Sequence, residues 1–162
     1  MATFDQKHAA GFTMALTYAV GVGGIGLAFS TLFEPQPELR WATLLAVGLT
    51  GILSFVRHSL LHRGDAARMG WDTGTTNPFQ IEVGLANLAW GVLATIAVIF
   101  NWGLAVYSAT FLVFGFYMVA VTGFKLILAS RGARHEWVAS VSAGSFGVVL
   151  TIVGIAGMQA AT

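Results

Sequence analysis

The chain has 162 residues, of which 56% are hydrophobic and 9% are charged, whereas soluble globular domains carry about 25% charged residues. Mean hydropathy is +0.76. Eight Lys and Arg against seven Asp and Glu leave no basic surplus for a phosphate backbone, which argues against a nucleic-acid partner. The lack of cysteine excludes a disulfide scaffold, a thiolate nucleophile and a Cys-ligated metal site. The high hydropathy and the low share of charged residues indicate a membrane protein.

Five apolar runs are long enough to cross a bilayer, whose core of about 30 Å needs roughly 20 helical residues. They cover residues 9–33, 41–62, 78–101, 104–129 and 136–158. None alternates with period two, as the strands of a membrane barrel do. Because backbone groups in lipid must be hydrogen-bonded within their own segment, we predict an all-α, polytopic helical bundle. It would form a single transmembrane domain of five helices.

Proline, glycine and asparagine mark the connections between these runs. Residues 34–38 contain two prolines and cannot continue a helix. Asn77 and Pro78 predict an N-cap followed by proline at the first helical position, with Gln80 completing a capping box. Residues 101–103 predict a tight reversal, so the third and fourth helices should be antiparallel neighbours.

Basic residues lie mainly on one side of the predicted membrane, the side with the N-terminus, the 63–77 loop and the 130–135 turn. They are Lys7, Arg57, Arg63, Arg68, Lys125, Arg131 and Arg134, whereas only Arg40 lies on the other side. Cytoplasmic loops are enriched in Lys and Arg. We therefore predict a cytoplasmic N-terminus and a C-terminus outside.

Polar residues of the predicted helices gather toward the same side. The candidate ligand-binding residues are Arg57, His58, Gln80, Glu82, Asn87 and Lys125. Ionisable and amide groups within membrane helices often mark solute or proton sites. We expect Glu82 to be the charge partner or proton acceptor, Arg57 or Lys125 its counter-ion, and Asn87 an orienting amide. A structural alternative remains, in which the charged groups are interfacial anchors and Asn87 makes an inter-helix hydrogen bond.

Two histidines lie four residues apart on the second predicted helix, a spacing that places both rings on one face. If Glu82 approached from the third helix, His58, His62 and Glu82 would form a two-His-one-carboxylate metal site. Haem ligation by His58 is a variant of this hypothesis. The alternatives are an interfacial hydrogen-bonding role and a proton-sensitive role, since imidazole titrates near neutral pH.

Small residues recur every four positions on the first and last predicted helices. They are Gly11, Ala15, Ala19 and Gly23, and Ala139, Ala143, Gly147 and Thr151. Such spacing lets helices approach closely, either within one chain or between the copies of a homo-oligomer.

The loop at 63–77 is the longest connection, and loops of this length are often functional. Residues 65–71 are expected to form one interfacial turn that covers the polar cluster, with an inert surface loop as the alternative.

The stretch from Arg57 to Leu93 resembles the central signature of a family of small, uncharacterised bacterial integral-membrane proteins. The matching positions are Trp71, Gly74, 78–80, 82–84, 86–88 and Gly91, with the core PFQ-x-EVG-x-AN. The loop at 75–77 is longer than in that pattern. The resemblance implies a bacterial cytoplasmic membrane and supplies no catalytic residue. The glutamate followed by a Gly-rich apolar stretch is also similar to DoxX-like four-helix proteins, some linked to quinone-coupled electron transfer, which would imply one helix fewer.

The sequence leaves three functions open, all with the lipid bilayer as partner. The first, which we favour, is a multi-pass membrane protein whose cytoplasm-side polar pocket binds or passes a small solute or proton. The second is a structural or assembly subunit of a membrane complex, acting through its small-residue stripes. The third is a membrane oxidoreductase subunit that uses haem, a metal ion or a quinone. No nucleophile–base pair is visible, which disfavours hydrolysis.

Overall fold

The computed structural model describes residues 4–70, 72–130 and 136–162, and within these ranges it is helical with no strand. The elements in chain order are α1 (Phe4–Thr31), α2 (Arg40–Thr43), η1 (Leu44–Leu49), α3 (Thr50–Phe55), η2 (Val56–Leu60), α4 (His62–Met69), α5 (Pro78–Ile99), α6 (Leu104–Ser130) and α7 (Glu136–Ala160). The four segments from α2 to η2 form one continuous helix, which contains two π-helical stretches, η1 and η2.

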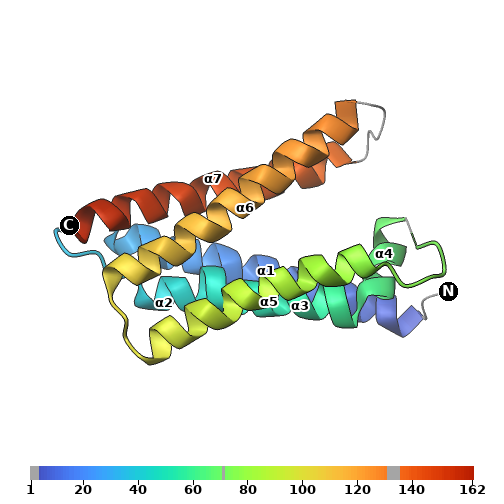
Figure 1. Ribbon diagram of the computed structural model, residues 1–162, viewed down its shortest axis with the longest axis horizontal. Helices are drawn as coiled ribbons and strands as arrows, with labels where there is room; N and C mark the ends of the chain where they lie inside the picture. Colours follow the sequence, from blue (N-terminus) through green and yellow to red (C-terminus); the bar gives the residue numbers. More distant parts are fainter. Residues whose placement is uncertain (1–3, 71, 131–135) are drawn as a thin grey trace.

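Five helices of the described chain are long and apolar enough to cross a membrane. They are Phe4–Thr31, Arg40–Leu60, Pro78–Ile99, Leu104–Ser130 and Ser140–Ala160. The predicted all-α membrane bundle of five spans is confirmed. The start of α1 and the end of α7 lie at opposite ends of the bundle, as an odd number of spans requires (Figure 1).

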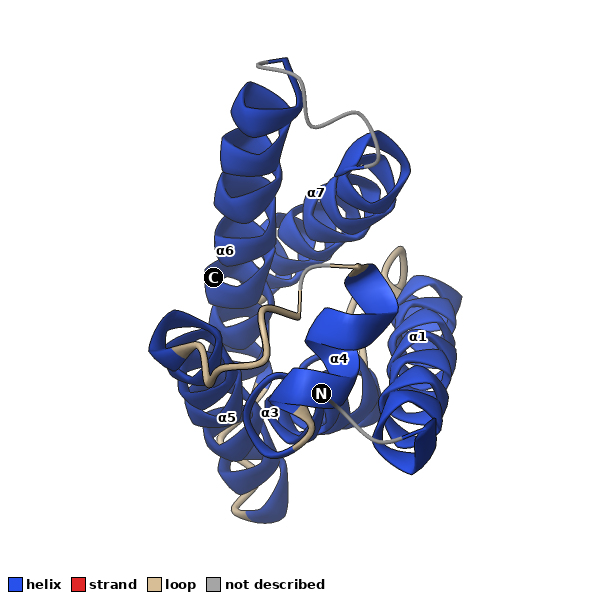
Figure 2. Ribbon diagram, turned by 90° about the vertical axis from the view of Figure 1, so that its right-hand side faces the viewer, coloured by secondary structure: helices blue, strands red, loops and turns tan. Residues whose placement is uncertain are grey.

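α6 and α7 form a hairpin that packs mainly on itself. A Cβ atom added at Gly147 of α7 would lie 2.8 Å from the Met118 Cβ and 3.0 Å from the Val119 nitrogen of α6. Glycine here allows the close helix contact typical of membrane packing. Toward the end that carries α4, the hairpin diverges from the other helices (Figures 1 and 2).

The helix Arg40–Leu60 and α5 also approach each other through glycine. A Cβ added at Gly51 would lie 2.6 Å from the Asn87 carbonyl oxygen and 2.9 Å from the Gly91 Cα. These two backbones are therefore in direct contact, which fixes how α5 sits beside the second span.

The small-residue stripe of α1 does not form the inner face of that helix. The buried residues of α1 are Ala10, Thr13, Gly21, Gly24 and Ala28, whereas Ala15, Ala19 and Gly23 are exposed. On α7 the arrangement is the opposite, because Gly147 is buried against α6. The side chain of Ala139 lies outside the described residues.

The apolar core occupies the half of the bundle away from α4. It includes Leu39, Val47, Val98, Phe111 and Leu150, all at most 5% exposed. Along α5, the buried residues are polar or glycine from Gln80 to Gly91 and apolar from Ala94 to Val98. The end of the bundle that carries α4 therefore contains most of the buried polar residues.

Candidate functional site

The connection after the second span begins with a short helix. Leu61 bends the backbone (φ −104°, ψ 22°), α4 follows directly, and it ends at Gly70 in the left-handed conformation (φ +83°). Gly64 lets α4 lie against the backbone of Gln6 on α1. The predicted single turn at 65–71 is thus an eight-residue helix that starts earlier, at His62. Trp71, the last residue of that predicted turn, lies outside the described residues.

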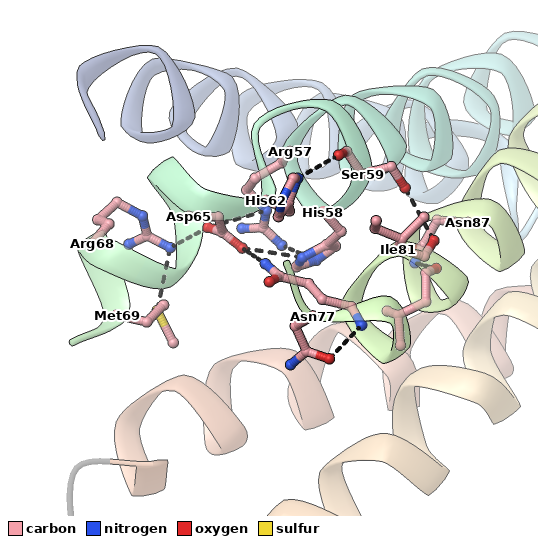
Figure 3. Close-up of polar contacts among 12 residues, drawn as sticks. Arg57, His58, Ser59, His62, Asp65, Arg68, Met69, Asn77, Ile81 and Asn87 are labelled. Atoms are coloured by element: carbon pink, nitrogen blue, oxygen red, sulfur yellow. Dashed lines mark hydrogen bonds and ion pairs between the residues drawn. The ribbon is translucent and has the colours of Figure 1, made fainter. Parts of the chain in front are cut away.

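A buried carboxylate, that of Asp65 on α4, is the centre of the polar end, and its side chain is 3% exposed. Its Oδ2 lies 3.1 Å from the His58 Nδ1 and accepts a hydrogen bond from the Gln80 Nε2 at 3.4 Å. Its Oδ1 accepts a hydrogen bond from the Arg68 Nη2 at 3.1 Å and lies 3.8 Å from the Arg57 Nε. Figure 3 shows the side chains of Arg57, His58 and Arg68, from η2 and α4, converging on Asp65.

Asp65 remains charged because its neighbours compensate for burial. Burial alone would raise the pKa of this carboxyl group. The hydrogen bond with His58 and the positive charge of Arg57 outweigh that effect, so the pKa lies below its ordinary value of 3.8. Asp65 is therefore an ionised group at neutral pH, held between two guanidinium groups.

The contacts of His58 define which of its ring nitrogens carries the proton. The Arg57 Nη2 lies 2.7 Å from the His58 Nε2, and a guanidinium can only donate. Nε2 therefore accepts, and Nδ1 donates to Asp65. Lys125 on α6 lies close enough to His58 to act on it electrostatically. The cluster thus combines two guanidinium groups, one neutral imidazole and one carboxylate.

A small cavity of about 110 Å³ adjoins this cluster. It is lined by His62, Arg63, Ala66, Asp72, Thr73, Thr75, Asn77 and Gln80. A cavity needs only about 10–15 Å³, by the same type of measurement, to hold one water molecule. The space is therefore sufficient for several waters or a solute of a few heavy atoms.

The N-terminus of α5 forms one side of the cavity. The Asn77 Oδ1 accepts hydrogen bonds from the Phe79 nitrogen at 3.1 Å and the Gln80 nitrogen at 3.4 Å, and Pro78 occupies the first turn. The predicted N-cap is confirmed. The side chain of Gln80 does not complete a capping box, because it donates to Asp65 instead. Gln80 therefore links the charged cluster to the cavity.

Three of the six predicted ligand-binding residues come together around Asp65. Arg57, His58 and Gln80 contact Asp65 or each other, and Lys125 lies within electrostatic range. Glu82 is exposed on α5 and is not among the partners of Asp65. The carboxylate that lies among these side chains is thus that of Asp65, which belongs to the predicted interfacial turn, and not that of Glu82.

Asn87 lies deeper in the bundle, away from the Asp65 contacts. It is buried, and its Nδ2 donates to the Val83 carbonyl of its own helix at 2.7 Å. Its side chain also lies against the Tyr117 hydroxyl of α6. The hydrogen bond shown for Asn87 is thus within α5, and the inter-helix hydrogen bond of the structural alternative stays a prediction.

The expected metal set is not assembled in the described chain. Glu82 is exposed, and His62 turns its Nδ1 to the Ser59 carbonyl oxygen at 2.9 Å. Among the residues with described positions, no group of three or more His, Asp or Glu side chains is placed to hold a metal ion. We therefore do not carry the set His58, His62 and Glu82 further.

Comparison with known proteins gives one result. No curated protein and no solved structure matches the chain. A family model described as a family of unknown function (DUF6790) matches residues 11–151. Since this match covers most of the sequence, including α4 and the cavity, the chain belongs to the DUF6790 family.

Proposed function

We propose that this protein is a membrane receptor or carrier that binds a small polar solute in the 110 Å³ cavity between α4 and the start of α5. The observation that carries the proposal is the lining of the cavity, in which seven of the eight residues have polar side chains. They are His62, Arg63, Asp72, Thr73, Thr75, Asn77 and Gln80, and the eighth residue is Ala66.

A cavity with polar side chains on its wall favours a polar occupant, because buried donors and acceptors need hydrogen-bond partners. Leaving a buried donor or acceptor unpaired costs about 1–3 kcal/mol for each group. The Arg63 Nη2 lies 3.5 Å from the Asp72 Oδ2, an ion pair too long for a strong hydrogen bond. A solute with donors and acceptors can form hydrogen bonds with several of the polar side chains of the lining at once.

Proton passage is less well supported than solute binding. Arg57 and Asp65 occupy both ring nitrogens of His58. A proton arriving at His58 would have to displace the guanidinium of Arg57, which is unfavourable in a buried site.

We further propose that the cavity faces the cytoplasm and that the membrane is the bacterial cytoplasmic membrane. The support is the positive-inside rule, because Lys7, Arg63 and Arg68 belong to the cavity end whereas Arg40 belongs to the other. Two further cations of this argument, Arg131 and Arg134, lie outside the described residues.

The test measures binding of four small probes to the purified protein in detergent micelles: glycine, acetate, methylammonium and acetamide. Calorimetric titration of wild type is compared with Ala66→Leu, which fills the cavity, and with Ala67→Leu. Ala66 lines the cavity and Ala67 is its neighbour on α4 outside the lining, so the pair separates cavity filling from a change in helix sequence.

We expect at least one probe to bind wild type and Ala67→Leu, and to lose at least tenfold in affinity for Ala66→Leu. The proposal is contradicted if none of the four binds wild type, or if Ala66→Leu binds as tightly as Ala67→Leu.

A further inference from the structure

A second cleft, which we call the α1–α4 cleft, lies where the start of α1 meets α4. Its volume is about 350 Å³, and it is lined by Lys7, His8, Gly11, Phe12 and Arg68. The first four of these belong to α1, and Arg68 belongs to α4. Gly11 faces the Arg68 side chain, because a Cβ added at Gly11 would lie 3.8 Å from the Arg68 Cδ. The cleft shares no lining residue with the 110 Å³ cavity, so it is a separate candidate site.

The length of α1 puts this cleft at the surface of the membrane. The 28 residues of α1 extend about 42 Å, whereas the hydrocarbon core of a bilayer is about 30 Å thick. The consecutive polar residues 5–8 keep the first turn of α1 out of the hydrocarbon, at the level of the headgroups. Phe12 lies about 7 Å further along the helix than Lys7 and is 72% exposed. The cleft therefore has a polar part beside the headgroups and an apolar part beside the acyl chains.

Two cations of the cleft have donors that the protein leaves unused. Lys7 is exposed, and its ammonium group has no ion pair or hydrogen bond with a described residue. Arg68 donates to Asp65 and to the Met69 sulfur, in both cases through Nη2. The Arg68 Nη1 bonds to none of the described residues and is not among the buried unpaired atoms, so it is accessible. An anion in the cleft can accept hydrogen bonds from both side chains.

The nearby carboxylates do not cancel this charge. Asp65 is 3% exposed and shares its Oδ1 between the Arg68 Nη2 at 3.1 Å and the Arg57 Nε at 3.8 Å. One buried negative charge therefore faces two guanidinium groups. Asp5 is the acidic residue of the first turn of α1, but it does not line the cleft and forms no ion pair with a described cation. Together with Lys7, the cleft keeps a net positive charge.

We propose that the α1–α4 cleft binds an anionic phospholipid, with the lipid phosphate on Lys7 and Arg68 and an acyl chain along Phe12. Phosphate oxygens accept charge-assisted hydrogen bonds from ammonium and guanidinium groups. Basic pockets between membrane helices are typical sites for such headgroups. Phe12 and Leu16 lie four residues apart on one face of α1 and are 72% and 39% exposed, so the apolar surface continues from the cleft into the membrane. A soluble phosphate would leave that surface unused, which favours a lipid.

The test uses native mass spectrometry of the full chain, released from non-ionic detergent micelles that contain phosphatidylglycerol and phosphatidylcholine at equal concentration. Both lipids have a phosphate, but Lys7 and Arg68 repel the ammonium group of choline. One Lys or Arg near an anionic headgroup contributes about 1 kcal/mol, which corresponds to about fivefold in affinity. We expect wild type to retain phosphatidylglycerol over phosphatidylcholine by about fivefold or more.

Two pairs of variants locate the lipid. Lys7→Gln should reduce the preference for phosphatidylglycerol by about fivefold, whereas Arg40→Gln, which removes a cation outside the cleft at the other end of the bundle, should leave it unchanged. Gly11→Leu fills the cleft and should lower the retention of phosphatidylglycerol. Gly23→Leu is its control on the same helix, at a position with nothing within 4 Å. Lys7→Gln decides the question if Gly11→Leu fails to fold, since the Lys7 ammonium group has no partner to lose.

The inference is overturned if wild type retains the two lipids equally. It is also overturned if Arg40→Gln lowers the preference as much as Lys7→Gln, because basic residues then attract anionic lipid without a specific site. Displacement of phosphatidylglycerol by an excess of inorganic phosphate would likewise contradict it, since the occupant would then be a soluble phosphate. None of these results bears on the 110 Å³ cavity, whose test is the separate comparison of Ala66→Leu with Ala67→Leu.

Discussion

Substitution Asp65→Asn is the sharpest test of the charged cluster. The change keeps the size of the side chain and one carbonyl acceptor, but it removes the negative charge between Arg57 and Arg68. Because the Asp65 side chain is 3% exposed and those of Arg57 and Arg68 are 16% and 22% exposed, water only partly replaces the lost partner. We expect Asp65→Asn to fold less stably while the five spans remain inserted.

The size of the loss follows from the contacts. Removing one partner of a buried ion pair costs about 3–5 kcal/mol. The two arginines are partly exposed, so solvent screens their charges and lowers the cost. The amide nitrogen of asparagine must also replace the oxygen to which either His58 or Arg68 now donates, which leaves that donor unpaired. We therefore expect a decrease of about 2–4 kcal/mol in the free energy of unfolding.

The assay is reversible unfolding in mixed micelles, with the helical signal followed as the denaturing detergent is increased. Glu82→Gln is the matched control, since it removes the same charge from an exposed position on α5. It should change the free energy of unfolding by less than about 0.5 kcal/mol. Equal effects of Asp65→Asn and Glu82→Gln would refute the central role of Asp65 and return attention to Glu82.

Two further predictions concern acidity and packing. The pKa of Asp65 is lowered in the folded protein. Its contribution to the free energy of unfolding is therefore complete above the unfolded pKa near 3.8 and is lost as pH falls through the folded pKa. Wild type should thus lose stability below about pH 4 more steeply than Asp65→Asn in the same unfolding assay. Gly51→Ala places a methyl group 2.6 Å from the Asn87 carbonyl oxygen and should cost about 1–3 kcal/mol, whereas Gly23→Ala, with nothing within 4 Å, should cost nothing.

The spans were predictable because a membrane imposes two simple requirements, length and hydropathy. The predicted third and fourth helices, 78–101 and 104–129, differ from α5 and α6 by one or two residues at their ends. Asn77, Pro78 and Gly103 mark those ends through backbone conformation, and the φ of Gly103 is +88°. The residues at these helix ends were therefore sufficient to predict the boundaries.

The two π-helical stretches carry no comparable sequence signal. η1 contains Gly48, where an added Cβ would lie 3.0 Å from the Thr95 Oγ1 of α5. η2 contains Arg57 and His58, whose side chains both face Asp65 or its partners. A π-helical turn rotates successive side chains differently from an α-helix. Helical-wheel reasoning that assumes 3.6 residues per turn therefore misjudges which residues of this helix share a face.

The carboxylate of the cluster was misassigned for a related reason. Glu82 lies inside an apolar helix, where an acidic residue suggests a function, whereas Asp65 lies in a polar stretch whose pattern predicts only one interfacial turn. The local evidence for Asp65 was its i, i+3 spacing to Arg68, a pair that α4 does form at 3.1 Å. Burial of Asp65 depends on the close contact of Gly64 with α1, and such tertiary contacts are not readable from one sequence.

The position of Asp65 also determines how experiments on the cavity must be designed. Its carboxylate joins η2 through His58, α4 through Arg68 and α5 through Gln80. These are the elements whose spacing forms the cavity, so loss of Asp65 would change binding by moving the walls even if Asp65 never contacts a solute. A decrease in affinity for Asp65→Asn would not identify a ligand contact. Arg63 and His62 line the cavity without contacting Asp65, and substitutions there distinguish recognition of the solute from construction of its site.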